Sequence, residues 1–288
     1  MEIKLAKNSG FCFGVKEAIK KAENIIAENH GNKKRIYTCG SLIHNKIVTD
    51  GLKRKGVSTI NNVREAEDGS VVVVRSHGEP WRFYLEAEKK GLEIVDATCP
   101  FVRRIQNLVK EAKEEGLNVV IVGDKNHPEI IGINGWCNDE AQIVNSVEEA
   151  KQVVGDNLFV VAQTTIRRDL FDEIVKILND SKSKVEVHNT ICNATSERQQ
   201  SCMETAKESE IMIIIGDRNS SNTVKLFEIA NKYCDNTYFV EDKDHLPLDE
   251  IKKYNKIGIS AGASTPKHVI QEVMDTIQEL SLQNGESD

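Results

Sequence analysis

The stretch IVDATCPFVRRI (residues 94–105) places a cysteine where a strand is expected to end and a helix to begin. A short apolar run precedes Asp96, as in a buried strand of a parallel sheet. From Val102 onward, apolar residues recur every three or four positions, which is the spacing of one helix face. Pro100 suits the first position of that helix, where its missing N–H costs no hydrogen bond. Cys99 is therefore predicted to lie at a strand-to-helix junction.

Two other cysteines repeat this arrangement. Cys12 lies 87 residues before Cys99, and Cys192 lies 93 residues after it. They follow the β-like stretches EIKLAKNSGFC (2–12) and VEVHNTIC (185–192), and each precedes a helical pattern, the second of which is weaker. Recurrence at intervals of about 90 residues predicts three copies of one structural plan.

The three copies are also alike in the segments after each helix. A strand-like run leads through glycine to a polar tip, and a second strand-like run later ends in a polar tip of its own. The first runs are RIYTCGSLIHN (35–45), NVVIVGDKNHPE (118–129) and IMIIIGDRNSSN (211–222). The second runs are VVVVRSHG (71–78), LFVVAQTT (158–165) and KIGISAGAS (256–264). The tips carry His44, His127 and Ser220 in the first set and His77, Thr164 and Ser264 in the second.

This order of elements predicts an α/β fold of three lobes with mainly parallel sheets covered by helices. The predicted lobes are residues 1–97, 98–190 and 191–282, followed by a polar tail at 283–288. Parallel sheets bind ligands beyond the carboxyl ends of their strands. Because each cysteine and each polar tip follows such an end, we expect the lobes to be related by a pseudo-threefold axis around a central cavity.

Composition narrows the protein class. The chain has 288 residues, 39% hydrophobic and 29% charged, with a net charge of −7, so neither a nucleic-acid coat nor a membrane surface is expected as partner. No apolar run is long enough for a membrane span, and the start has no signal-peptide core. A cytoplasmic protein is expected. Its seven cysteines, an odd number without CxxC spacing, argue against a disulfide framework.

Three thiolates that converge on one point would repel one another, so they require a cation or a cationic cluster. A zinc ion with three cysteines and one open position meets this requirement, and so does an iron–sulfur cluster with one iron left free. The residues alone leave both alternatives open. The other four cysteines are expected to be buried small residues: Cys39, Cys137, Cys202 and Cys234.

Nine short motifs, taken in order, resemble the 4-hydroxy-3-methylbut-2-enyl diphosphate reductase family, the last enzymes of the non-mevalonate isoprenoid pathway. The resemblance covers about residues 3–280. The motifs are GFCFGV (10–15), IHN (43–45), RSHG (75–78), DATCP (96–100), NHPE (126–129), QTT (163–165), ICNAT (191–195), NSSN (219–222) and AGAS (261–264).

The resemblance implies a cofactor and a reaction. It implies a [4Fe–4S] cluster held by Cys12, Cys99 and Cys192, with one open iron that takes the hydroxyl oxygen of the substrate. Two electrons and two protons then remove this oxygen as water and give isopentenyl and dimethylallyl diphosphate. The proton-donating glutamate of the family aligns with Glu129.

The polar tips suit a diphosphate substrate. Histidines, serines and an amide offer hydrogen-bond donors, while the chain has no GxxxxGK[ST] loop. The expected substrate-binding residues are His44, His77, His127, Thr164, Ser220, Ser221, Asn222 and Ser264. Glu129, His127 and Thr164 are the expected catalytic residues, with Thr164 relaying a proton or orienting the hydroxyl.

Two rival functions would use the same cysteines. A non-catalytic iron–sulfur sensor would hold a cluster without turnover, and a zinc-dependent phosphohydrolase would hold zinc and release phosphate. For the reductase, the absence of NAD and flavin motifs means that electrons come from a partner protein, which by family analogy is ferredoxin or flavodoxin.

Overall fold

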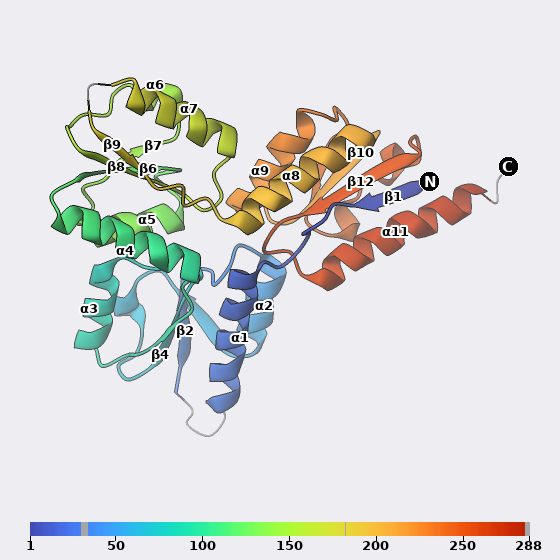
Figure 1. Cartoon of the computed structure of the whole chain (residues 1–288). Helices are drawn as coiled ribbons and strands as arrows, with labels where there is room; N and C mark the ends of the chain where they lie inside the picture. Colours follow the sequence, from blue (N-terminus) through green and yellow to red (C-terminus); the bar gives the residue numbers. More distant parts are fainter. Residues whose placement is uncertain (30–33, 182, 286–288) are drawn as a thin grey trace. The chain divides into compact units, whose positions relative to one another are not determined.

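The computed structural model describes residues 1–29, 34–181 and 183–285 (Figure 1). The chain divides into two compact units. The first unit is Met1–Phe13, His44–Val48 and Asn193–Asp288. The second unit is Gly14–Ile43 and Thr49–Cys192.

The first unit contains one four-stranded parallel sheet in the order β1-β12-β10-β11. Its two central strands, β10 and β12, are apolar and almost entirely buried, as expected of a sheet with helices on both faces. Figure 1 shows the blue β1 arrow alongside β12. The strands are β1 (Glu2–Leu5), β10 (Ile211–Ile215), β11 (Thr237–Val240) and β12 (Lys256–Ala261).

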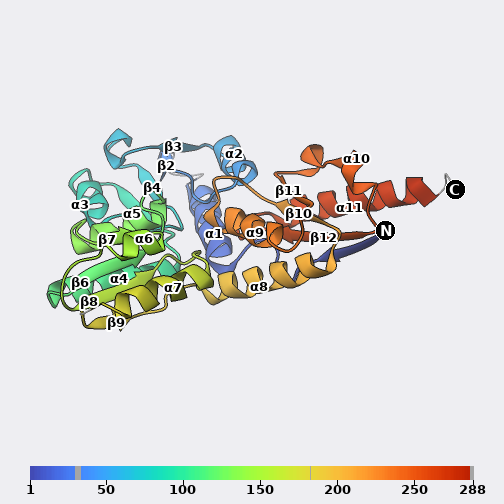
Figure 2. The same cartoon turned by 90° about the horizontal axis from the view of Figure 1, so that it is seen from above.

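Helices cover both faces of this sheet because successive side chains of β10 point to opposite sides. Met212 and Ile214 pack with α8 (Asn193–Glu208) and α9 (Ser221–Asn231), which lie side by side (Figure 1 and Figure 2). Ile213 faces the opposite core, to which α11 (Lys267–Gly285) contributes. The short η3 (Lys243–His245) and α10 (Leu248–Ile251) follow β11.

The second unit contains two four-stranded parallel sheets. The first has the order β3-β2-β4-β5, and the apolar Val72 and Val74 pack against Phe83 of α3. Its strands are β2 (Ile36–Cys39), β3 (Val57–Ile60), β4 (Val71–Val74) and β5 (Glu93–Asp96). The neighbouring helices along the chain are α1 (Phe13–Glu28), α2 (Lys46–Arg54), η1 (Val63–Glu65) and α3 (Trp81–Lys89).

The second sheet of this unit has the order β7-β6-β8-β9 and again alternates its apolar side chains. Ile121 packs with α4 and α5, whereas Val120 packs with α7. The strands are β6 (Asn118–Val122), β7 (Gln142–Val144), β8 (Leu158–Ala162) and β9 (Val185–Val187). The helices are α4 (Pro100–Glu114), α5 (Pro128–Asn134), η2 (Gly135–Cys137), α6 (Val147–Ala150) and α7 (Arg168–Asn179).

The prediction of three α/β lobes with parallel sheets is confirmed. Each sheet has the same order, and in each the strand at one edge leads directly toward a cysteine: β1 toward Cys12, β5 toward Cys99 and β9 toward Cys192. The threefold relation and the central cavity remain predictions, as do the boundaries between the lobes.

One pairing differs from the expected assignment of strands to lobes. The strand before Cys12, placed in residues 1–97 from sequence, is hydrogen-bonded to β12 and completes the sheet of the third lobe. The physical reason is that all three sheets share one plan. The strand that leads to a cysteine pairs with a central strand: β5 with β4, β9 with β8, and β1 with β12. β1 is therefore the edge strand of the third sheet, as β5 and β9 are of the other two.

The C-terminal end also differs from expectation. The polar composition predicts a tail at 283–288, but α11 continues through Gly285. Leu280 is buried in the core of the first unit and extends the packed part of the helix almost to its end. Residues 286–288 lie outside the described residues. Throughout the described residues, no helix combines the length and the apolar character that crossing a membrane requires.

Candidate functional site

Cys99 occupies the N-cap position of α4, and Pro100 lies in the first turn, as the sequence predicts. The backbone N–H of Cys99 donates to the carbonyl of Ser76 at 2.9 Å, which ties the cysteine to the turn after β4. Gly14 of α1 packs directly on the sulfur: a Cβ at this position would lie 2.5 Å from Cys99 Sγ. The Cys99 thiol is therefore set in a tight junction of α1, α4 and the turn that carries His77.

The other two predicted ligand cysteines lie in similar turns. In the second unit, the N–H of Cys192 donates to the carbonyl of Thr164 at 3.1 Å. In the first unit, the N–H of Cys12 donates to the carbonyl of Ala263 at 3.0 Å. Each cysteine is thus anchored to a turn that also bears a predicted substrate-binding residue.

Exposure separates the seven cysteines into two groups. Cys12, Cys99 and Cys192 are partly exposed, whereas the other four are buried, and all seven are free thiols. Burial raises the pKa of Cys39, Cys137 and Cys202 to about 11, and it also raises the pKa of Cys234. These four stay protonated near neutral pH, so their predicted role as buried small residues is confirmed and metal ligation by them is disfavoured.

Glu129 is the most deeply placed of the predicted catalytic groups, with 2% of its surface exposed. It lies in the first turn of α5, after the N-cap His127. Oε1 accepts the backbone N–H of Thr164 and Oε2 accepts the Thr164 hydroxyl, both at 2.7 Å. Burial raises the pKa of Glu129 because it disfavours the charged form, and the two bonds from Thr164 oppose this effect.

The proton position on His127 follows from its hydrogen bond. Nδ1 accepts the N–H of Glu129 at 3.1 Å, so a neutral His127 ring carries its proton on Nε2. The ring stands edge-on to His77, with centroids 5.3 Å apart. The structure therefore brings His77, His127, Glu129 and Thr164 together within the second unit.

The first unit contains the remaining predicted substrate-binding residues. Ser220 is the N-cap of α9 and accepts the N–H of Thr223, and Ser221 lies in the first turn. Ser264 Oγ donates to the carbonyl of His44 at 2.8 Å. Asn222 is 4% exposed, and within the described part of the chain neither polar atom of its side chain has a hydrogen-bond partner. A buried amide in this state is suited to receive a polar ligand.

Two supporting residues were not predicted from the sequence. Gln163 Oε1 accepts the N–H of Asp124 at 3.0 Å and holds the loop that leads to His127. Arg198, 3% exposed, donates to the carbonyl of Gly10 at 2.9 Å and so fixes the loop that leads to Cys12. Their only sequence signal is their nearness to Thr164 and Cys192.

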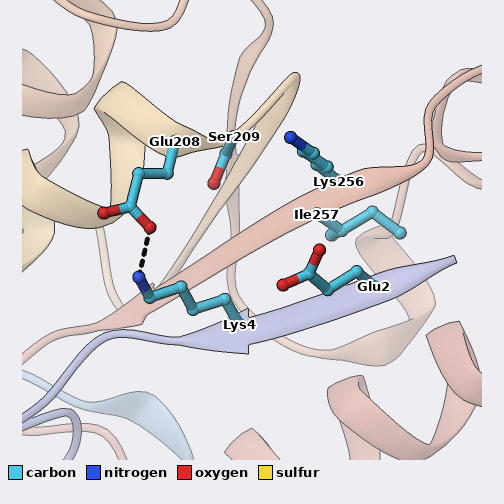
Figure 3. A pocket seen from close by; sticks show the side chains of 6 residues that line it. All are labelled: Glu2, Lys4, Glu208, Ser209, Lys256 and Ile257. Atoms are coloured by element: carbon cyan, nitrogen blue, oxygen red, sulfur yellow. Dashed lines mark hydrogen bonds and ion pairs between the residues drawn. The ribbon is translucent and has the colours of Figure 1, made fainter.

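A separate pocket of about 210 Å³ lies along β1 and the start of β12 (Figure 3). Lys4 and Glu208 form an ion pair across it. The other lining residues are Glu2, Ser209, Lys256 and Ile257. None of the predicted site residues borders this pocket.

Comparison with known proteins agrees with the resemblance seen in the sequence. The family model described as LytB protein matches residues 3–278. A protein of Caldanaerobacter subterraneus subsp. tengcongensis, named 4-hydroxy-3-methylbut-2-enyl diphosphate reductase, is 44% identical over 97% of this chain and 98% of its own length. A protein of the same name from Clostridioides difficile is 43% identical over 97% of this chain and its own full length.

Two solved structures are similar across nearly the whole chain. One is described as (E)-4-hydroxy-3-methyl-but-2-enyl diphosphate reductase, the terminal enzyme of the non-mevalonate pathway; its TM-score is 0.71, with 40% identity over 97% of this chain and 100% of that chain. The other is the E-1-hydroxy-2-methyl-but-2-enyl-4-diphosphate reductase of Plasmodium falciparum, with a TM-score of 0.89 and 28% identity over 95% of this chain and 86% of that chain. With the family model covering almost every residue, and with relatives above 40% identity end to end, the chain belongs to the LytB protein family.

Proposed function

We propose that the chain catalyses the reaction for which its relatives are named, the reduction of 4-hydroxy-3-methylbut-2-enyl diphosphate. It is an iron–sulfur oxidoreductase of the non-mevalonate pathway. Two electrons and two protons remove the hydroxyl group as water, and isopentenyl and dimethylallyl diphosphate are the products. The single observation that carries this proposal is the buried Glu129 carboxyl bonded twice to Thr164, because a dehydroxylation needs a proton source shielded from water.

The cysteines fit a [4Fe–4S] cluster with three protein ligands. Cys12, Cys99 and Cys192 are the partly exposed members of the set, and each follows a strand of a parallel sheet. When bound, such a cluster supplies electrons and a Lewis-acidic iron at its open position.

Glu129 holds the proton for the departing oxygen. Its raised pKa favours the protonated form, in which the carboxyl group is a donor. The Thr164 hydroxyl bonds to Glu129 Oε2 and is placed to pass this proton on or to orient the substrate hydroxyl. His127 keeps its Nε2 proton available for an oxygen of the substrate, because Nδ1 is engaged by Glu129 N–H.

The diphosphate is bound by neutral donors and imidazoles. The unpartnered amide of Asn222, among the described residues, supports this role most strongly. The N-terminus of α9, an 11-residue helix, adds backbone N–H groups that favour an anion. The proposed binding residues are His44, His77, His127, Thr164, Ser220, Ser221, Asn222 and Ser264.

Electrons reach the cluster from a carrier protein, which we propose to be ferredoxin or flavodoxin. The seven free thiols fit a reducing compartment, so we place the reaction in the cytoplasm.

The proposed function is tested by anaerobic turnover. Protein purified without oxygen should oxidise reduced viologen dye only when the diphosphate substrate is added, and should form the two isomeric diphosphates. Dye oxidation that does not depend on substrate, in protein that holds a cluster, would instead identify a sensor.

Replacing Gly14 with Ala should lower the iron content to less than about half of the wild-type value. The new Cβ would lie 2.5 Å from Cys99 Sγ, well inside van der Waals contact, so the sulfur has to move from its place. Iron is measured after anaerobic purification. Gly51→Ala in α2 is the matched control, because the nearest atom to its Cβ is 4.0 Å away. A fully loaded Gly14→Ala protein would show that the packing of Gly14 on the sulfur is not needed for cluster binding.

Replacing Glu129 with Gln should raise the thermal unfolding midpoint at alkaline pH. The pKa of Glu129 in the folded protein is above its ordinary value of 4.5, so its contribution to stability is full below pH 4.5 and is lost as pH rises through the folded-state pKa. The variant escapes this loss. We expect a gain of about 2–4 °C at alkaline pH that shrinks as the pH falls toward 4.5. Scanning fluorimetry across this range measures it.

The control for this experiment is Glu173→Gln, which changes an exposed carboxylate on α7. Its midpoint should follow that of the wild type at every pH. A Glu129→Gln difference that is constant or grows at acid pH would show that burial does not favour the protonated form.

A further inference from the structure

The turn that carries His77 is closed by a buried ion pair. Arg75 and Glu79 lie two residues to either side of His77, and Arg75 Nε meets Glu79 Oε1 at 2.7 Å. The two side chains are only 16% and 6% exposed. Burial of opposite charges is costly unless they stay together, so the pair holds the two ends of the turn at a defined distance.

The backbone of this turn is fixed on its other sides. The carbonyl of Leu42 accepts both the N–H of Ser76 at 3.2 Å and its hydroxyl at 3.3 Å. Gly78 has a φ of +75°, and a Cβ there would lie 2.4 Å from Gln106 Nε2. These contacts fix the backbone of Ser76 and Gly78, and the ion pair fixes Arg75 and Glu79. The backbone on both sides of His77 is therefore held in place.

The same turn connects two parts of the proposed site. The carbonyl of Ser76 accepts the N–H of Cys99, and the carbonyls of His77 and Gly78 lie 3.3 Å and 3.0 Å from a Cβ built on Gly132 of α5. His127 is the N-cap of helix α5, and Glu129 lies in its first turn. A change in the closure of the turn therefore alters the position of His77 relative to His127.

We propose that Arg75 and Glu79 are positioning residues, which hold the His77 imidazole edge-on to His127 so that both rings reach one diphosphate group. This inference rests on the proposed function, since it assumes that His77 binds the diphosphate. Neither charge needs to touch the substrate. In the sequence, Arg75 and Glu79 are the first and last residues of the stretch RSHGE (75–79).

The test compares single and double variants, with inorganic diphosphate as the probe. Arg75→Met and Glu79→Leu each leave one buried charge without its partner, and both should lose thermal stability. The double variant Arg75→Met/Glu79→Leu removes both charges and should recover most of that stability. Calorimetry of the anaerobically purified protein gives the Kd for diphosphate, and turnover gives KM and kcat for the substrate.

In the double variant we expect the diphosphate Kd and the substrate KM to rise about tenfold while kcat changes less than about threefold. Arg75→Lys, which keeps the charge without the guanidinium geometry, should give an intermediate Kd. The control is Arg64→Met, because Arg64 and Glu86 form an exposed ion pair in the same lobe, with 73% and 30% of their side chains exposed. Its Kd and KM should equal those of the wild type.

Recovery of both stability and wild-type Kd in the double variant would overturn the proposal, because the pair would then serve folding alone. Failure of the wild type to bind diphosphate at all would refute the proposed binding role of His77 itself. A raised diphosphate Kd together with recovered stability in the double variant supports the positioning role.

Discussion

Replacing Glu129 with Gln is expected to leave the iron content at the wild-type level and to lower turnover by about a hundredfold or more, as is typical when a general acid is lost. The amide matches the carboxyl in size and can still accept the backbone N–H of Thr164, which donates to Oε1 at 2.7 Å. It cannot release a proton to the departing oxygen. The chemical step should therefore fail in a protein whose fold and cofactor are intact.

The control is Asp124, the carboxylate in the loop that leads to α5. Asp124 is exposed and accepts the N–H of Asn126 at 2.9 Å, so Asp124→Asn should keep most of the activity. Turnover is measured anaerobically with reduced viologen, at matched iron content. Near-normal turnover in Glu129→Gln would end the role of Glu129 as proton source and leave Thr164 or His127 to supply the proton.

Replacing any one of Cys12, Cys99 or Cys192 with Ser is expected to abolish activity and to remove most of the iron. A cubane with three protein ligands and one open iron has no ligand in reserve, and a serine hydroxyl is a poor substitute for a thiolate. Iron, acid-labile sulfide and turnover are measured on the same anaerobic preparation.

Cys202→Ser is the matched control. This thiol is fully buried, its pKa is raised to about 11 by burial, and its sulfur lies 3.6 Å from the carbonyl of Leu226, a bond that a hydroxyl can also make. The variant should keep both iron and activity. Equal loss of iron in Cys202→Ser and Cys99→Ser would mean that cysteine replacement acts through folding rather than through ligation.

Much of the fold follows from local patterns in the sequence. The helix after Cys99 begins at Pro100, where the sequence places it, since proline and the apolar spacing are both local signals. One central strand of each sheet is a continuous apolar run: VVVV at 71–74, LFVVA at 158–162 and IMIII at 211–215. Edge strands are harder to predict: β3, VSTI at 57–60, has its two central residues exposed and gives no such run.

Contacts between residues far apart in the sequence could not be predicted from local sequence patterns. The pairing of β1 with β12 joins residues about 250 positions apart, and no periodicity near Glu2 reveals its partner. The buried ion pair of Arg75 and Glu79 was missed for a similar reason, because a charged residue in sequence is expected on the surface unless its partner is known.

The resemblance supplies the residue types of the proposed site but not their contacts. Glu129 was identified by resemblance, whereas its two bonds to Thr164 depend on the placement of β8 beside β6. The exposure of Cys12, Cys99 and Cys192, in contrast with the other four, likewise appears only once the helices are packed. The position of His127 as N-cap of α5 was partly predictable, because the following Pro128 is a local signal for the start of a helix.

The central claim is that thiolates from remote parts of the chain hold one iron–sulfur cluster, and metal analysis of anaerobically purified protein tests it most directly. We predict a coloured protein with about four iron atoms and about four acid-labile sulfides per chain. Colourless protein that contains zinc, or that contains neither iron nor sulfide after anaerobic reconstitution, would contradict it.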